Sequence, residues 1–297
     1  MEDKSDKYTI FPISLLEETI SILKDRGAAF TTYKALTFGG LLDTAAAHYL
    51  SEYAYFKRGR RDLFSVALAV LERQIMRGRP PFLASLKPLT RTRHPLTVIL
   101  QHDADRLPDK TQAVMEMERE LGVISANFFF RRDAYGEGDS YDLDVPRLQA
   151  LETEGFEVGY HLNAYELARY DPIKAQAIAE QDVAWFRERF DLKTYVPHSG
   201  IKNSEGLNNE HFPQSGALRE LIWAYNRRGV LSDFGWSDGA AGIWATPGDP
   251  REFAKKAPEG TRIFMLLHPQ YYGENLCLGW ENLPLAQCDW WRKVWQL

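Results

Sequence analysis

Carboxylate and imidazole side chains follow several short apolar segments of this chain, and these side chains are the best candidates for chemistry. Residues 96–100 read Leu-Thr-Val-Ile-Leu, the pattern of a buried parallel strand, and His102, Asp103 and Asp105 come directly after them. Four further apolar segments are each followed by one such side chain: His161, His198, Asp233 and His268. Carboxylates and imidazoles together suit a divalent ion such as zinc, and they also act as general acids and bases.

The elements that must position these residues alternate between strand and helix patterns. We expect parallel strands at about residues 96–101, 124–130, 156–160, 194–197, 229–232 and 263–267. We expect helices at residues 14–26, 145–154, 172–190 and 218–227, and another between Asp109 and Gly122. Ser14 with Glu17, and Asp109 with Gln112, fit the capping-box pattern. The alternation predicts an α/β fold with a parallel sheet, open or closed into a barrel, whose carboxyl ends lie on one face.

The first ninety residues differ in pattern from the rest of the chain. Residues 28–33 resemble a short strand, and residues 41–55 and 62–76 two further helices. Residues 77–95 contain four prolines and cannot form a long helix. We therefore expect a mainly helical region at residues 1–90, packed on an α/β barrel at residues 91–297, to which it could supply one unit.

Composition excludes several classes of protein. The 297 residues carry a net charge of −5, and we interpret the basic run at residues 57–61 as a solvated helix connection and not as a nucleic-acid-binding patch. Residues 1–8 are polar and charged, and no apolar run approaches the roughly 18 residues of a membrane span. We expect a cytoplasmic protein with no nucleic-acid partner and no membrane span; the sequence does not indicate an oligomeric state.

Three segments resemble motifs of the polysaccharide deacetylase superfamily, the hydrolases of carbohydrate esterase family 4. They are His102-Asp103-Ala104-Asp105, the segment Glu157 to His161, and Leu266-Leu267-His268-Pro269. The resemblance covers roughly residues 96–270. It implies a distorted (β/α) barrel that removes acyl groups from N-acylated sugars with a metal-bound water.

The resemblance also implies a role for each motif residue. Asp103 resembles the catalytic base and His268 the general acid, with Asp233 as the carboxylate that tunes the acid. Asp105 and His161 resemble metal ligands. The groove-lining third motif corresponds to residues 197–200, so Ser199 is expected to contact substrate, together with the neighbouring candidates Tyr195 and Asn163.

The chain departs from the family pattern at two positions. Tyr165 stands where the family has a second histidine ligand, and Tyr195 stands where an arginine orients the base. The metal site is therefore either rebuilt or lost. For a rebuilt site we predict His198 as the third ligand, ahead of Asn163 and Tyr165. Residues 15–36 resemble the family's closing helix–strand unit but precede the first motif, as in a circularly permuted barrel.

Three functions are consistent with these features. The first is a metal-dependent hydrolase, with zinc as the expected ion, that removes an acyl group from an N-acylated sugar or glycan precursor, its substrate a small molecule or an oligosaccharide. The second is a hydrolase of a non-sugar amide or ureide. The third is a catalytically inactive barrel that serves as a binding protein. The tryptophan-rich tail after residue 279 is expected to pack at the barrel bottom, or else to stack on sugars or contact another subunit.

Overall fold

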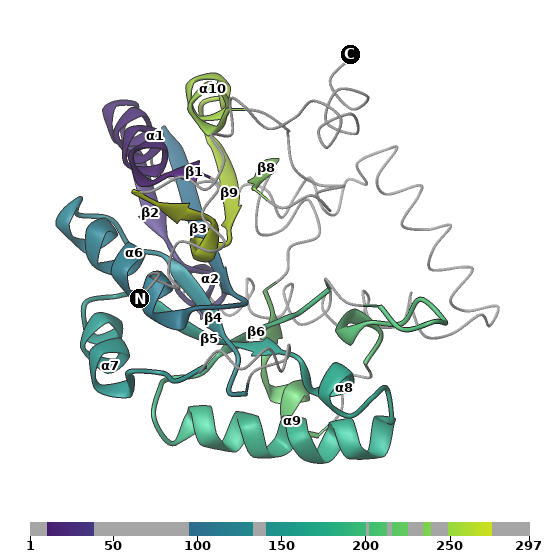
Figure 1. Ribbon diagram of the computed structural model, residues 1–297. Coiled ribbons are helices and arrows are strands. Elements are labelled where there is room, and N and C mark those ends of the chain that lie inside the picture. The colour runs from purple at the N-terminus through teal and green to yellow at the C-terminus, as the bar shows by residue number, and fades with distance from the viewer. Residues whose placement is uncertain are drawn as a thin grey trace.

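The fold is built around one parallel β-sheet. The computed structural model describes residues 11–38, 95–132, 141–199, 202–212, 216–224, 234–238 and 249–274. The main sheet contains β2 (Ala28–Thr31), β3 (Leu96–Ala104), β4 (Ala126–Phe129), β5 (Glu157–Leu162), β6 (Thr194–Pro197), β7 (Ile222–Trp223), β8 (Phe234–Ser237) and β9 (Thr261–Leu267). Seven of these strands follow the order β7-β6-β5-β4-β3-β9-β8, all pairs are parallel, and the sheet curls into a half-barrel (Figure 1).

Helices cover the outer face of the curled sheet (Figure 1). The described helices are α1 (Ile13–Asp25), α2 (Tyr33–Phe38), α6 (Pro108–Glu120), α7 (Val145–Thr153), α8 (Ala164–Leu167), α9 (Pro172–Arg187) and α10 (Pro250–Lys256), with short 3₁₀ turns η2 (Asn209–His211), η3 (Gly216–Glu220) and η4 (Pro269–Tyr271). Helix α1 buries Leu15, Leu16, Thr19, Ile20 and Leu23. That stripe recurs at three- and four-residue spacing, which places one apolar face against the sheet.

The pleat of the strands separates two kinds of buried surface. In β3, Leu96, Val98 and Leu100 belong to a core shared with α1 and α10, whereas Ile99 belongs to a smaller core inside the curl. Because successive side chains alternate between faces, Gln101, Asp103 and Asp105 continue the inner row of Ile99. The same alternation places His161, His198 and His268 on the inner face of their strands. The inner face therefore carries Asp103, Asp105 and the three histidines, and the outer face binds the helices.

The amino-terminal segment is part of the sheet. Strand β2 pairs with the first half of β3, residue 28 opposite residue 96, while the second half of β3 pairs with β4. The two-residue strand β1 (Phe11–Pro12) pairs in parallel with β10 (Tyr272–Gly273), which follows the last strand of the main sheet. Strand β2, from the amino-terminal region, is thus part of the main sheet.

Most predicted elements agree with the structure, but three expectations are wrong. Residues 218–227 were expected to be a helix, yet β7 (Ile222–Trp223) pairs there with the start of β6. Neither predicted capping box forms, because α1 begins after Pro12 and α6 begins at Pro108. Ser14 and Asp109 therefore lie inside the first turn. The expected helices at 41–55 and 62–76, the strand at 229–232 and the tail after residue 279 lie outside the described residues.

Candidate metal centre

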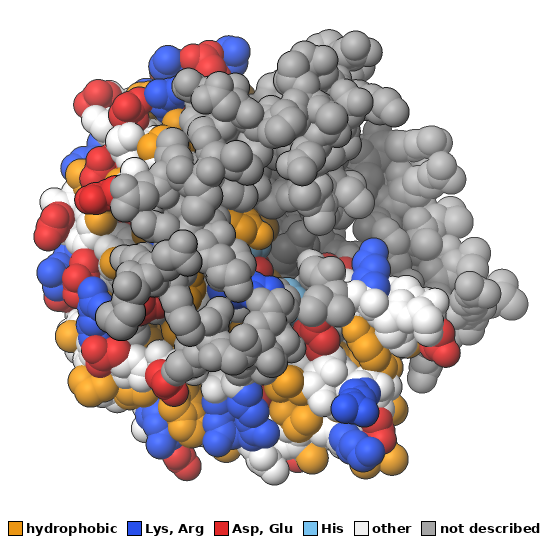
Figure 2. All heavy atoms as spheres, in the orientation of Figure 1, with side chains coloured by type: hydrophobic (Ala, Val, Ile, Leu, Met, Phe, Trp, Pro, Cys, Tyr) orange, Lys and Arg blue, Asp and Glu red, His pale blue; other side chains and the backbone are white. Residues whose placement is uncertain are grey.

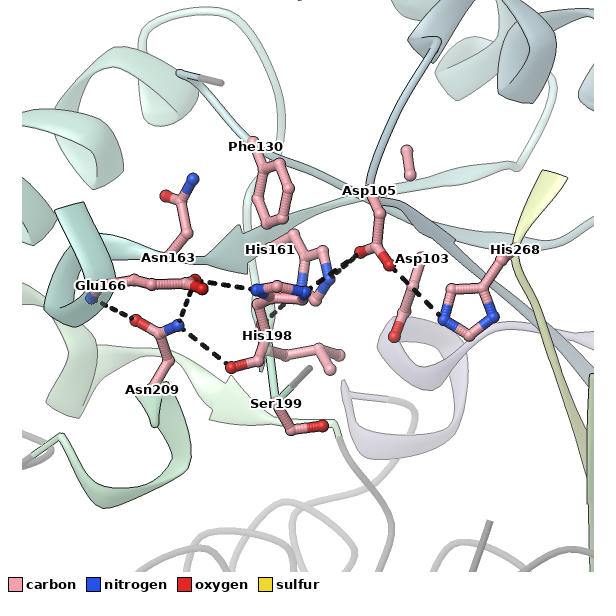
Figure 3. A network of polar contacts seen from close by, with 12 residues as sticks. Asp103, Asp105, Phe130, His161, Asn163, Glu166, His198, Ser199, Asn209 and His268 are labelled. Atoms are coloured by element: carbon pink, nitrogen blue, oxygen red, sulfur yellow. Dashed lines mark hydrogen bonds and ion pairs between the residues drawn. The ribbon is translucent and has the colours of Figure 1, made fainter. Parts of the chain in front are cut away.

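Asp105 lies just beyond the end of β3, at the centre of a group of three imidazoles (Figure 3). Its Oδ1 lies 2.9 Å from Nε2 of His161 and 4.0 Å from Nε2 of His198. Its Oδ2 lies 3.7 Å from Nε2 of His268. Burial opposes ionisation of Asp105, but the three imidazoles outweigh burial and hold the pKa of this carboxyl well below its usual range. Four strand-end residues predicted to converge are thus brought together.

Each of the three imidazoles has its other nitrogen, Nδ1, engaged on the side away from Asp105. His161 Nδ1 lies 2.9 Å from the carbonyl oxygen of Val196, and His198 Nδ1 lies 2.9 Å from Glu166 Oε2. A carbonyl or carboxylate oxygen can only accept, so the ring nitrogen donates and the Nε2 atoms are the ones directed at Asp105. This is the arrangement that metal-binding histidines adopt in proteins.

His161 is also fixed by aromatic packing. The Phe130 ring stacks on it at a centroid distance of 4.6 Å and an interplanar angle of 6°, and meets His198 edge-on at 5.4 Å. Burial lowers the pKa of His161, but the neighbouring carboxylates Asp103 and Asp105 outweigh burial and raise it. The carboxylate of Asp105 therefore favours a proton on Nε2 of His161.

His268 is paired with a carboxylate that the sequence analysis did not identify. Asp238 Oδ1 accepts from His268 Nδ1 at 2.6 Å, and Asp238 Oδ2 accepts from the His268 backbone N–H at 2.7 Å. Burial lowers the pKa of His268, but Asp238, followed by Asp105 and Asp103, outweighs burial and raises it to about 10. Asp233, expected to tune His268, lies outside the described residues. Asp238 follows β8 directly, and this strand-end position was the signal that could have identified it.

Asp103 lies on the inner row of β3 and is held by a neutral partner. The amide Nε2 of Gln101 donates to Asp103 Oδ1 at 2.9 Å, and the hydroxyl of Tyr33 donates to Gln101 Oε1 at 2.6 Å. Figure 3 shows the Asp103 carboxylate between Asp105 and the imidazole of His268. Asp103, which was expected to act as the base without the arginine of the family pattern, is thus oriented by an amide. Neither Gln101 nor Tyr33 was singled out from the sequence.

The three residues expected to contact substrate are not brought to the Asp105 cluster. Tyr195 faces the outer core, where its ring stacks on Trp223 at 6.3 Å. Asn163 is buried, its Nδ2 donates to the backbone carbonyl of Arg132, and its side chain points away from Asp105 (Figure 3). Ser199 follows His198, but in the same view its hydroxyl is directed away from the imidazoles.

Tyr165 does not occupy a ligand position either. Its ring packs against Tyr170 and Phe212 in the outer core. Burial raises the pKa of its phenol, whereas metal binding would need a lowered value. Of the candidates for a third ligand, only His198 therefore presents a donor atom toward Asp105.

Two of the candidate metal ligands, Asp105 and His161, contact each other directly. In the part of the chain that the structure describes, no group of three or more His, Cys, Asp or Glu side chains is already arranged to hold a metal ion. Asp105 and His161 form a hydrogen bond of 2.9 Å. A metal ion bound by both side chains would separate these two groups. The chemistry of the set, one carboxylate with two imidazoles whose outer nitrogens are anchored, nevertheless fits zinc.

Comparisons with family models, with curated proteins and with solved structures found no match to this chain. None of the helices within the described ranges combines the length and apolar character that crossing a bilayer requires. The surface in Figure 2 carries acidic and basic side chains interspersed over the described elements, without a large patch of one sign. The Asp105 cluster is therefore the feature on which a functional argument rests.

Proposed function

We propose that this chain is a metal-dependent amide hydrolase of the polysaccharide deacetylase type, which removes an acyl group from an N-acylated sugar or glycan precursor. The observation that carries the proposal is the convergence of Asp105, His161 and His198, with both imidazoles anchored through Nδ1. A divalent ion on these three side chains, with zinc favoured by the donor set, would polarise the acyl carbonyl and lower the pKa of a coordinated water.

The remaining roles fall to Asp103 and His268. Asp103, oriented by Gln101, would accept the proton of the attacking water. His268 has its pKa raised to about 10, so it is protonated at neutral pH and can donate a proton to the leaving amine nitrogen. Both groups lie beside Asp105, with Asp103 between Asp105 and the imidazole of His268 (Figure 3).

Metal content and turnover test this proposal together. Protein purified without added metal is expected to contain about one equivalent of zinc, and to release acetate from one member of a panel of N-acetylated sugars. Asp103→Asn and His268→Ala should each lower turnover by about a hundredfold or more while retaining the metal, because neither is a proposed ligand. Loss of zinc in His268→Ala would reassign that residue as a ligand.

A second candidate is a catalytically inactive binding protein. The direct contact between Asp105 and His161 favours it, because in a metal-free barrel this pair is a buried ion pair that needs no further ligand. The same experiment separates the two. Protein that stays free of zinc after dialysis against zinc, and releases no acetate, would support the binding protein.

A further inference from the structure

His198 is held from behind by a short helix on the neighbouring strand connection. Glu166 belongs to α8, its side chain is buried, and its Oε2 lies 2.9 Å from Nδ1 of His198. With Nδ1 committed to this acceptor, Nε2 is turned toward Asp105 Oδ1 at 4.0 Å. Figure 3 shows Glu166, His198 and Asp105 in sequence across the site. Glu166 therefore fixes which nitrogen of His198 faces the proposed metal position.

Asn209 fixes Glu166 in turn. Its Oδ1 accepts from the backbone N–H groups of Tyr165 and Glu166, at 2.9 and 3.2 Å. Its Nδ2 donates to Glu166 Oε2 at 2.9 Å and to the backbone oxygen of His198 at 3.1 Å. One buried amide thus joins the start of α8 to the loop after β6. The placement of His198 depends on both connections.

The burial of the Glu166 carboxylate is unfavourable for the stability of the fold. The second oxygen of Glu166, Oε1, is buried and forms no hydrogen bond within the described residues. A buried carboxylate that is only partly hydrogen-bonded destabilises the folded state. Buried groups of this kind occur in proteins mainly at functional sites. This carboxylate therefore needs a role other than stability.

We propose that Glu166, held by Asn209, is the positioning residue of His198 and sets the affinity of the Asp105, His161 and His198 group for zinc. The inference rests on the proposed function, since it assumes that the group binds a metal. A carboxylate on the outer nitrogen of a ligating histidine orients the ring and increases the basicity of the nitrogen that faces the ion. Glu166 would thereby let His198 replace the histidine that Tyr165 does not supply.

Zinc affinity, measured by competition with a chromophoric chelator, tests the role of Glu166 without any substrate. In full-length protein, Glu166→Ala should weaken zinc binding by about 10- to 100-fold. Glu166→Gln should weaken it less, because the amide oxygen still accepts from Nδ1. The control is Glu205→Gln, which removes the same charge from an exposed residue of the following loop and should leave the affinity unchanged.

A second variant covers the case in which Glu166→Ala does not fold. Asn209→Asp keeps the acceptor for the two backbone N–H groups but replaces the donor to Glu166 with an oxygen. It should weaken zinc binding while preserving the circular dichroism spectrum. In cobalt-substituted protein, the visible absorption bands should change in Asn209→Asp and stay unchanged in Glu205→Gln, because they report the ligand geometry.

The outcomes separate this inference from the proposed function. If the wild-type protein binds neither zinc nor cobalt, the proposed function fails. If the wild type binds zinc, and Glu166→Ala and Asn209→Asp bind it equally tightly, Glu166 has only a structural role and this inference alone is overturned. If His198→Ala also binds zinc as tightly as the wild type, His198 is not a ligand and Glu166 has nothing to position.

Discussion

At the scale of single residues, the site is defined by which nitrogen of each imidazole faces inward. Three different acceptors, the Val196 carbonyl, Glu166 and Asp238, engage the Nδ1 atoms of the three histidines. In each case Nε2 faces Asp105. Such fixed tautomers are expected where a ring must bind a metal or transfer a proton at a defined atom.

Asp238→Asn should lower the pKa of His268 from about 10 toward its ordinary value of 6.5, because Asp238 is the largest favourable influence on the charged ring. A raised folded-state pKa stabilises the fold fully below the unfolded value of about 6.5, and this stabilisation is lost as the pH rises toward 10. The variant should therefore be less stable than the wild type at pH 6, with the difference shrinking by pH 10.

Two measurements on metal-free protein check this expectation. An NMR titration of the imidazole C–H signals gives the pKa of His268 in both proteins, and urea unfolding at several pH values gives the stability difference. His161 serves as the internal control, because it does not contact Asp238 in the hydrogen-bond network. Titration of His268 near 6.5 in the wild-type protein would contradict the argument.

The sequence located the converging strand-end residues better than their hydrogen-bond partners. Asp105, His161, His198 and His268 were predictable because each follows an apolar strand, and parallel strands end on one face. Of their partners, Glu166 depends on where a connecting segment places its side chain, which no local pattern encodes, whereas Asp238 directly follows β8 and Gln101 lies in β3. The wrong expectation that Tyr195 contacts substrate was avoidable. His198 lies three residues further on, so along an extended chain the two side chains face opposite sides.

At the scale of elements, tertiary pairing overrode one local pattern, and prolines at helix entries overrode two others. Residues 218–227 have a helical pattern, but the backbone of Ile222 and Trp223 pairs with Thr194 and Tyr195 at the edge of the sheet. The capping boxes failed because a proline at the entry of each helix set the first turn instead. Strands with continuous apolar runs were predicted well, since burial on both faces leaves a strong signal.

Strand β5 approaches its neighbour closely at Gly159, two residues before His161. A Cβ atom at this position would lie 2.4 Å from Cε1 of Phe128 on β4. Gly159→Ala should therefore destabilise the fold by about 1–3 kcal/mol, because the Phe128 ring has to shift within a packed core. Urea unfolding of the variant and the wild type measures the difference.

Phe128→Leu in the same background is the matched control. The smaller side chain relieves the overlap, so the double variant should lose less than the sum of the two single losses. Additive losses would show that the two positions do not interact. A Gly159→Ala variant within about 0.5 kcal/mol of the wild type would show that the strands separate at no cost.

At the scale of the whole molecule, the amino-terminal segment joins the sheet below the site. Strand β2 pairs with the first half of β3, and the backbone N–H of Lys34 donates to the buried carboxylate of Glu157 at the start of β5. Tyr33, between these two connections, enters the inner core beside Phe128. A segment that precedes the first motif by more than sixty residues thus reaches the proposed base.

The link from the amino terminus to the base runs through two hydrogen bonds, from Tyr33 to Gln101 and from Gln101 to Asp103. Tyr33→Phe removes only the hydroxyl and leaves Gln101 Oε1 buried without this donor. It should destabilise the fold by about 1–3 kcal/mol. If the amide then turns, Asp103 loses its orienting donor, and turnover should fall roughly two- to tenfold with zinc content unchanged.

A double-mutant cycle with Gln101→Leu tests whether the two bonds act as one chain. Gln101→Leu removes both bonds at once, so adding Tyr33→Phe to it should change stability and turnover little further. Urea unfolding and acetate release from the four proteins give the coupling in both quantities. Coupling in stability without coupling in turnover would mean that Tyr33 supports only the core. Coupling in both would make the amino-terminal segment part of the machinery that orients Asp103.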